Sequence, residues 1–528
     1  MKHRTVRIIC LALGVSIPSA LYAQAGADAR AARAYEAAAK GGPLTLRAFL
    51  DQFPKGADLH VHLSGAVYAE TLIKDAGEDG LCVDAKTLSL AKPPCDAPLE
   101  PAKELDGVLT QDEQDLYDRL VDSLSMRSYF PSSGFSGHDQ FFSVFGNGSP
   151  STSKFSGIDK RHVGEWVDEV ASRAADQNQQ YLELMQTPPF GHAATLAKEI
   201  GWAATPEKLD FAAIRQKLLD RGLRDEVKAD MEDVRSAEAR RKELEHCGTP
   251  QAQPACSVEI RYIYQILRAS APEVVFAQAL LGFETVAQTM KEGEPGFLGI
   301  NFVQPEDGFI SMRDYTLQMK MVDYLHSVYP KVHITLHAGE LVFGMVPPEG
   351  LRFHIRQAVE LGHAERIGHG VDVMYEDHAQ QLLKEMAEKH VMVEINLSSN
   401  EGILGIKGDM HPFPLYRAAH VPVALSTDDE GVSRIDITNE YVRAALDYHL
   451  SYSDLKQLAR TGMEHNFLPG ASLWSEPDAF TATAKECRGL APGSAHPSAT
   501  CRNFLEGSQK AAAQWELERR FRVFDSQF

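Results

Sequence analysis

The stretch Gly56-Ala57-Asp58-Leu59-His60-Val61-His62-Leu63 carries two histidines near the end of a short, mostly apolar run. Its length and its apolar residues predict a buried β-strand. Side chains two positions apart on a strand point to the same face, so His60 and His62 are expected to lie side by side. The sequence therefore predicts a pair of ligating imidazoles at the end of this strand.

Polar residues stand at the end of three further runs that are typical of buried strands: His337 after 331–336, His369 within 366–370, and Asp428-Asp429 after 421–427. Taken singly, each has an ordinary structural explanation, such as a loop histidine or an acidic helix start. Together with the run that carries His60 and His62, four different buried runs thus end in polar residues, and this coincidence has no joint structural explanation. Three imidazoles and one carboxylate suit a borderline divalent metal such as zinc, with one coordination position left for water. We therefore expect one zinc ion on His60, His62, His337 and Asp428.

Strand-like and helix-like segments alternate along most of the chain. The expected strands cover 57–63, 181–184, 258–267, 297–303, 331–337, 366–370, 391–396 and 421–427. Strands that alternate with helices predict a parallel sheet, and about eight of them predict an α/β fold of the (β/α)8 TIM barrel type. An open doubly wound sheet is the alternative. It is disfavoured because the first and last strands both carry ligands, and only closure brings these strands together.

The remaining segments are expected to extend a single hydrolase barrel domain over 26–528. An alanine-rich helical extension precedes the first strand at 26–50. Insertions are expected at about 77–140 and, with charged helices, at about 205–256, and a helical tail at about 471–528. Glycine and serine dominate 131–156, which predicts a long loop.

Composition narrows the function class. The 528 residues carry a formal net charge of −20, which argues against nucleic acid as a partner because a phosphate backbone requires a basic face. A basic head, the apolar stretch 8–20 and small residues near Ala23 predict a signal peptide over 1–25, with an N-terminal anchor as the alternative. We expect an exported protein, periplasmic or secreted, that is not attached to the membrane after cleavage.

The cysteines agree with export. Six of them lie outside the predicted signal peptide, in three neighbouring pairs within hydrophilic stretches. Fifteen pairings are possible, but proximity favours Cys82–Cys95, Cys247–Cys256 and Cys487–Cys501.

Four motifs resemble those of the adenosine deaminases, a family of metal-dependent hydrolases with barrel folds. They are Phe53 to Gly65 (FPKGADLHVHLSG), His337-Ala338-Gly339-Glu340, Arg366-Ile367-Gly368-His369-Gly370 and Ser426-Thr427-Asp428-Asp429, in the order typical of the family. The secretion signal, the extra N-terminal helix and the cysteine-bearing insertion resemble the secreted adenosine deaminase-related growth factor branch. Members of that branch are often dimeric, which makes a homodimer an expectation.

The resemblance implies a zinc-dependent deamination of adenosine, deoxyadenosine or a close 6-aminopurine nucleoside to inosine or its analogue and ammonia. Zinc on the four ligands would activate water for attack at C6, and Glu340 would donate a proton to N1. His369 would orient that water and take its proton, and Asp429 would hydrogen-bond near N7.

Two positions depart from the family pattern. Ser64 stands where classical members have an acid that contacts the ribose, and Gln304 stands where they have a glycine at the segment that meets purine N3. The sugar specificity therefore stays open, and two alternatives remain beside adenosine deamination. One is a related barrel aminohydrolase for another adenine derivative, and the other is a secreted nucleoside-binding or signalling protein.

Overall fold

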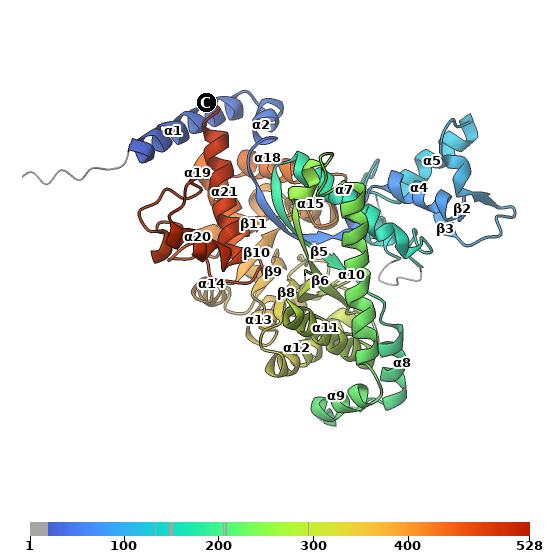
Figure 1. Ribbon diagram of the computed structural model, residues 1–528. Coiled ribbons are helices and arrows are strands. Elements are labelled where there is room, and N and C mark those ends of the chain that lie inside the picture. Colours follow the sequence, from blue (N-terminus) through green and yellow to red (C-terminus); the bar gives the residue numbers. More distant parts are fainter. Residues whose placement is uncertain (1–18, 133, 147–151, 204, 206–207, 294) are drawn as a thin grey trace, which may run out of the picture.

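The computed structural model describes residues 19–132, 134–146, 152–203, 205, 208–293 and 295–528, so most of the predicted signal peptide lies outside the described residues. Its centre is one sheet of eight parallel strands that neighbour one another in chain order. These are β1 (Gly56–His62), β5 (Gln179–Gln186), β6 (Glu259–Leu267), β7 (Phe297–Val303), β8 (His333–Ala338), β9 (Arg366–His369), β10 (Met392–Ile395) and β11 (Val423–Leu425) (Figure 1).

The sheet closes between its first and last strands. Val61 and Asp428 form a parallel bridge beyond the end of β11. The His62 amide donates to the Asp428 carbonyl at 3.1 Å, and the Asp428 amide donates to the His60 carbonyl at 2.8 Å. The predicted TIM barrel is thus confirmed, and the open doubly wound sheet is excluded.

Helices alternate with the strands and cover the barrel. They are α3 (Leu63–Ala66), α7 (Val163–Asp176), α8 (Gly191–Ile200), α11 (Pro272–Glu292), α12 (Phe309–Val328), α13 (His354–Glu360), α14 (Ala379–Glu388), α15 (Leu397–Leu404), α16 (Phe413–Ala418), α17 (Glu430–Ser433), α18 (Ile437–Asp447) and α19 (Tyr452–Glu464). Local sequence explains their ends: α11 starts at a proline, whose fixed φ suits the first helical turn, and stops at Gly293 in the left-handed conformation.

The two ends of the described chain meet on one side of the barrel. Figure 1 shows α1 (Ser19–Lys40) beside α21 (Gln509–Asp525), with α2 (Pro43–Leu50) and α20 (Ala499–Glu506) nearby. Aromatic rings join them: the Phe49 ring lies 5.3 Å from that of Phe524, and Phe53 contacts Phe521 and Phe524. Such ring pairs bury large apolar areas, so the two terminal segments pack as one layer.

The insertion after β1 projects from the barrel (Figure 1). It holds α4 (Ala69–Glu78), an antiparallel sheet of β2 (Cys82–Asp84), β3 (Ser89–Ala91) and β4 (Leu99–Pro101), and α5 (Gln111–Ser123). Its own apolar cluster includes Leu81, Val83, Leu90 and Leu120. The later helical insertion comprises α9 (Phe211–Asp220) and α10 (Arg224–Leu244).

All three predicted disulfide pairings are confirmed. Cys82–Cys95 joins β2 to the loop before β4, Cys247–Cys256 follows α10, and Cys487–Cys501 joins the turn Lys485–Cys487 to α20. Each bridge joins segments close in sequence, and none belongs to the sheet of the barrel.

The prediction of a long loop over 131–156 is wrong in its centre, where α6 (Gly137–Val144) forms. Ser136 caps this helix by accepting from the Asp139 amide, and the Asp139 carboxylate in turn accepts from the Ser136 amide. The apolar face of α6 packs on α15, so closely that a Cβ on Gly137 would lie 1.8 Å from the Gly402 carbonyl oxygen.

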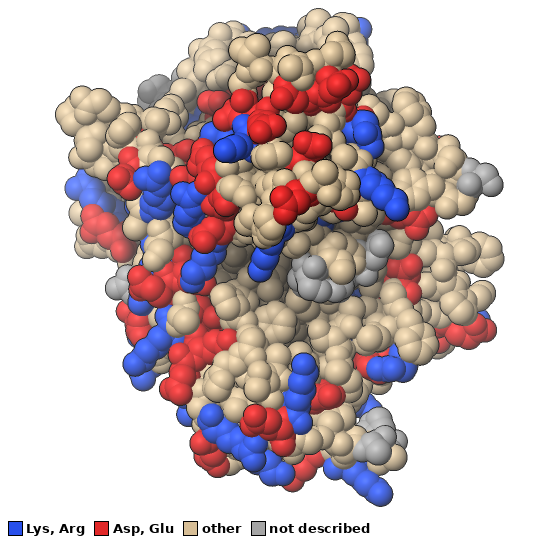
Figure 2. All heavy atoms as spheres, turned by 90° about the vertical axis from the view of Figure 1, so that its right-hand side faces the viewer, with Lys and Arg blue, Asp and Glu red and all other residues tan. Residues whose placement is uncertain are grey.

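Within the described part of the chain, none of the helices has the length and apolarity needed to cross a bilayer. Figure 2 shows Lys and Arg side chains interspersed with Asp and Glu over the face that it presents.

Candidate active site

The predicted site residues converge at the C-terminal end of the barrel. His62 Nε2 lies 3.1 Å from His337 Nε2 and 3.3 Å from Asp428 Oδ1. His60 Nε2 lies 3.4 Å from the same Asp428 oxygen, and His369 Nε2 lies 3.9 Å from Asp428 Oδ2. Strand ends far apart in sequence thus place four imidazoles around one carboxylate.

These side chains fit a metal ion. One ligating atom from each of His60, His337, His369 and Asp428 lies within 4.8 Å of the others, and all four residues are buried. His62 belongs to an overlapping group with Asp428 and Asp429. Nitrogen and carboxylate donors of this kind suit a zinc-like divalent cation.

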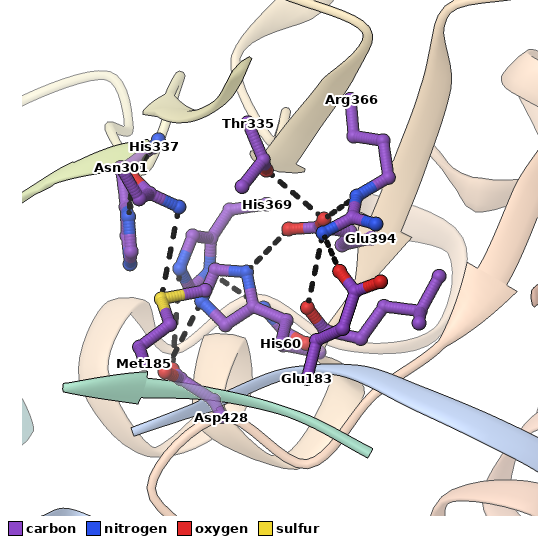
Figure 3. Close-up of polar contacts among 12 residues, drawn as sticks. His60, Glu183, Met185, Asn301, Thr335, His337, Arg366, His369, Glu394 and Asp428 are labelled. Carbon is purple, nitrogen blue, oxygen red and sulfur yellow. Dashed lines mark hydrogen bonds and ion pairs between the residues drawn. The ribbon is translucent and has the colours of Figure 1, made fainter. Parts of the chain in front are cut away.

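Hydrogen bonds turn two of the imidazoles toward the common centre (Figure 3). His60 Nδ1 contacts Glu394 Oε2 at 2.6 Å, and His337 Nδ1 contacts Asn301 Oδ1 at 2.8 Å. A proton on each Nδ1 leaves the Nε2 lone pair free, as in the carboxylate–histidine pairs that orient metal ligands. His60 Nε2 is buried without a hydrogen-bond partner, which a cation would satisfy.

A buried charge network lies beneath His60. Glu394 Oε1 accepts from Arg366 Nε at 2.7 Å and from Thr335 Oγ1 at 3.0 Å, while Arg366 pairs with Glu183 at 2.7 Å. Arg366 also lies 3.8 Å above the Phe467 ring. The sequence interpretation missed these roles. The signal was present, because Glu183 and Glu394 are charged residues within strands that are buried.

Three residues at the strand ends have left-handed backbone: His369 (φ 71°), Asp428 (φ 64°) and Gln304 (φ 89°). Non-glycine residues rarely adopt this conformation, and they hold it where surrounding contacts enforce it, often at functional sites. The Gln304 side chain is held by the Ala269 amide, which donates to its Oε1 at 2.8 Å. A positive φ at Gln304 also explains why a glycine suits the same position in relatives of the resembled family.

Glu340 is placed by a second glutamate. Glu306 accepts hydrogen bonds from the Gly339 amide at 3.0 Å and from the Glu340 amide at 2.8 Å, and it contacts His354 Nδ1 at 2.6 Å. The loop after β8 is therefore anchored by its backbone, and the Glu340 side chain faces the cavity. Burial, together with the negative charges of Asp428 and Glu306, raises the pKa of Glu340 well above its ordinary value.

The pKa values of the two adjacent aspartates are shifted in opposite directions. Burial opposes ionisation of Asp428, but the adjacent imidazoles of His60, His62 and His369 outweigh it and lower the Asp428 pKa well below its ordinary value. Ser399 Oγ donates to Asp428 Oδ2 at 2.6 Å. Burial and the charge of Asp428 raise the Asp429 pKa well above its ordinary value. The Asp429 carboxyl packs on Gly65, where a Cβ would lie 1.5 Å from its Oδ1.

A cavity of about 400 Å³ opens onto these groups. Ser64, Gln304, His337, Glu340, His369 and Asp429 line it, and its wall also includes five aromatic side chains: Phe141, Phe142, Phe145, Phe155 and Trp166. Three of these phenylalanines come from α6 and the residue that follows it, so the helix missed in the sequence supplies much of the wall. The predicted site residues thus line one cavity, except for His60, which lies behind the lining against Asp428.

Residues 226–473 match the family model described as adenosine deaminase. The adenosine deaminase of Clostridium perfringens is 33% identical over 135 residues, which are 25% of this chain and 37% of that protein. The adenosine deaminase of Escherichia coli is 38% identical over 137 residues, or 26% of this chain and 38% of that protein. These matches span little more than a third of the curated relatives.

Solved structures resemble the fold at lower identity. An adenine deaminase from Arthrobacter aurescens has a TM-score of 0.49 and 16% identity, and the match covers 79% of this chain and 94% of that one. Arabidopsis ADAL, solved in complex with GMP, has a TM-score of 0.49 and 20% identity, with 80% of this chain and 94% of that one covered.

Proposed function

We propose that this chain is a metal-dependent aminohydrolase of the adenosine deaminase family, acting on adenosine, deoxyadenosine or a close 6-aminopurine nucleoside, and the match of residues 226–473 to the adenosine deaminase family model supports this. The observation that carries the proposal is Glu340, a buried acid with a raised pKa that faces the same cavity as the histidine–aspartate cluster. A carboxyl group kept neutral beside ligating side chains suits proton donation to a substrate that receives a nucleophile.

We assign His60, His62, His337 and Asp428 as ligands of one zinc ion per chain. Zinc held by such ligands lowers the pKa of water and so supplies the nucleophile for hydrolysis at neutral pH. His369 then remains free to orient the attacking water. The convergence of Nε2 atoms on Asp428 supports this assignment.

Two acids contact the purine in this proposal. Glu340 donates its proton to N1 while C6 becomes tetrahedral, because negative charge gathers on that nitrogen. Asp429 donates a hydrogen bond to N7, which requires a neutral carboxyl, and its raised pKa supports that state. The product is the 6-oxopurine nucleoside, with ammonia as the leaving group.

We further propose that the substrate is uncharged. None of the described cavity-lining residues is Lys or Arg. A phosphate is normally bound by Arg, Lys or clustered backbone amides, so this cavity favours a nucleoside over a nucleotide.

Another adenine derivative is the second candidate substrate. Ser64 replaces the acid expected at the ribose, and the wall nearby is aromatic, which favours an apolar group on the purine or its sugar. A nucleoside-binding or signalling protein would require binding without turnover.

Export is proposed as well, with 1–25 as a removed signal peptide. Three disulfides support it, because such bonds persist in oxidising compartments. We also propose membership of the secreted growth factor-related branch and a homodimer formed through residues 26–50 and the insertion after β1.

The test is ultraviolet loss of adenosine absorbance with purified, zinc-loaded protein, run beside deoxyadenosine, AMP and adenine. We expect turnover of a nucleoside, with kcat/KM for AMP at least about 10²-fold lower, since none of the described residues that line the cavity is a Lys or Arg that could bind the phosphate. Elemental analysis should find one zinc ion per chain, and His60→Ala should lose metal and turnover together. Zinc-loaded protein that converts none of the four substrates would contradict the proposal.

A further inference from the structure

His411 is a buried histidine outside the cavity lining, and its protonation is fixed by the backbone. It follows the turn Gly408–Met410 and precedes α16. The Phe413 amide donates to His411 Nδ1 at 3.1 Å. A backbone N–H is only a donor, so His411 Nδ1 has to accept, and a neutral His411 carries its proton on Nε2.

That proton determines the orientation of the Asn400 side chain. His411 Nε2 lies 3.0 Å from Asn400 Oδ1, to which it donates. Since Oδ1 is turned toward His411, the Asn400 NH2 group is turned the other way, and its Nδ2 lies 3.0 Å from His369 Nδ1. Asn400 and His411 are both buried.

His369 Nδ1 therefore faces donors. Besides Asn400, the amide nitrogen of Asn396 approaches it at 3.4 Å. Glu340 Oε1 lies 3.7 Å away, beyond hydrogen-bond distance. A proton on Nδ1 would point at an NH2 group, so the ring proton belongs on Nε2, which is buried without a hydrogen-bond partner and lies 3.9 Å from Asp428 Oδ2.

We propose that Asn400 and His411 are positioning residues that fix His369 in its Nε2–H tautomer. The order of donation runs from the Phe413 amide through His411 and Asn400 to His369. In this state His369 Nε2 presents a hydrogen-bond donor to the reaction site instead of a lone pair. It is therefore a hydrogen-bond donor to the attacking oxygen, neither a metal ligand nor the proton acceptor that the family resemblance implies.

This inference extends the proposed function, but it is tested by a separate readout. Nitrogen-15 NMR of histidine-labelled full-length protein distinguishes protonated from unprotonated ring nitrogens without substrate. The His369 signals are identified by their loss in His369→Gln, and spectra are recorded for metal-free and zinc-loaded protein. We expect Nε2 to be protonated and Nδ1 unprotonated in both. A proton on His369 Nδ1, or a zinc-dependent loss of the Nε2 proton, would overturn the proposal.

Asn400→Asp is the sharpest variant, because a carboxylate offers His369 Nδ1 only an acceptor. The proton should move to Nδ1, and kcat should fall by about 10²–10⁴-fold with zinc retained, the scale seen when a catalytic histidine is held in the wrong tautomer. Asn400→Leu frees the ring to sample both tautomers and should lose less activity than Asn400→Asp. A packing role predicts the reverse order, which would overturn the proposal.

His411 offers a rescue test that avoids a buried charge. In His411→Gln the amide carbonyl can accept from the Phe413 N–H while the NH2 group donates to Asn400 Oδ1. In His411→Phe both functions are lost. We expect His411→Gln to keep the Nε2–H spectrum and most of kcat, and His411→Phe to give mixed tautomers and a kcat at least tenfold lower. Equal behaviour of the two variants would count against the proposal. If the spectra agree but no nucleoside is converted, the proposed function fails and the tautomer assignment stands.

Discussion

The surroundings of Glu340 support the role of proton donor that we propose for it. The backbone of its loop is fixed by Glu306, and burial beside Asp428 keeps its carboxyl protonated at a pH where an exposed glutamate is ionised. Raising the pH through the elevated pKa of Glu340 removes the proton that the proposed reaction delivers to N1, so activity should fall as the pH rises through that pKa. Activity should therefore hold across the pH range in which ordinary glutamates ionise, and fall only above it.

Glu340→Gln should keep zinc and bind product analogues while kcat drops by about 10²–10⁴-fold, because an amide cannot deliver a proton as a carboxylic acid does. The high-pH decline of the kcat profile should also disappear. Stopped-flow or steady-state turnover across a range of pH measures the drop in kcat and the shape of the profile, and metal analysis checks that zinc is retained. Glu376→Gln is the matched control: this glutamate is also buried with a pKa raised to about 7, but it accepts from the Ile355 amide away from the cavity. Near-normal kcat in Glu340→Gln would show that Glu340 is not the proton donor.

At the scale of elements, the eight strands of the barrel could be predicted, whereas helix α6 could not. Buried parallel strands appear in sequence as short apolar runs, so a polar residue such as His337 or Asp428 stands out at a strand end. Helix α6 has eight residues within a stretch rich in glycine and serine, and its stability comes from packing on α15, which sequence periodicity does not report. The Ser136–Asp139 capping box was the local signal available.

The partners of the site residues were harder still to predict. Asn301 and Glu394 lie on β7 and β10, and each reaches an imidazole from another strand. Their role depends on side chains that meet only after the barrel closes. The positive φ of Gln304, at a strand end, could not be predicted either, because a glycine is the residue that would have indicated it in the sequence.

Helix α6 carries a prediction about binding. Phe142→Ser should raise KM by about 10–100-fold with a smaller change in kcat, since losing a buried phenyl contact costs about 1.5–3 kcal/mol and the ring touches no reacting group. Steady-state kinetics over a range of nucleoside concentrations separates the two parameters. Phe130→Ser is the control, because Phe130 lies in the same insertion and its side chain is 80% exposed. A selective loss of kcat in Phe142→Ser would show that α6 acts on the chemistry instead.

For the whole molecule, closure of the barrel turns separate sequence signals into one site. His60 and His62 come from the first strand and Asp428 from the end of the last, 366 residues after His62, and their backbones bond directly to each other. Asp58 strengthens this seam: its carboxylate accepts from the Thr427 amide at 3.1 Å and from the Thr427 hydroxyl at 2.8 Å. The chemistry therefore depends on the complete fold, whereas the disulfides lie in segments added around it.

That separation predicts different effects on stability and on catalysis. Cys487 and Cys501 are buried with Leu473, Trp474 and Trp515 in a cluster of the C-terminal tail. Replacing both cysteines by serine should lower the free energy of unfolding by about 2–4 kcal/mol, because the unfolded tail regains the freedom that the bridge removes. Since neither residue lines the cavity, kcat and zinc content should stay unchanged.

Thiol titration under denaturing conditions gives the accompanying check. With all three bridges formed, the unreduced protein should show no free thiol if 1–25 has been removed, and one, Cys10, if it has not. Two or more thiols in the wild-type chain would contradict the disulfide framework and weaken the case for export. A large loss of kcat in the double serine variant, at a temperature where it is folded, would instead show that the tail supports the active site through the barrel wall.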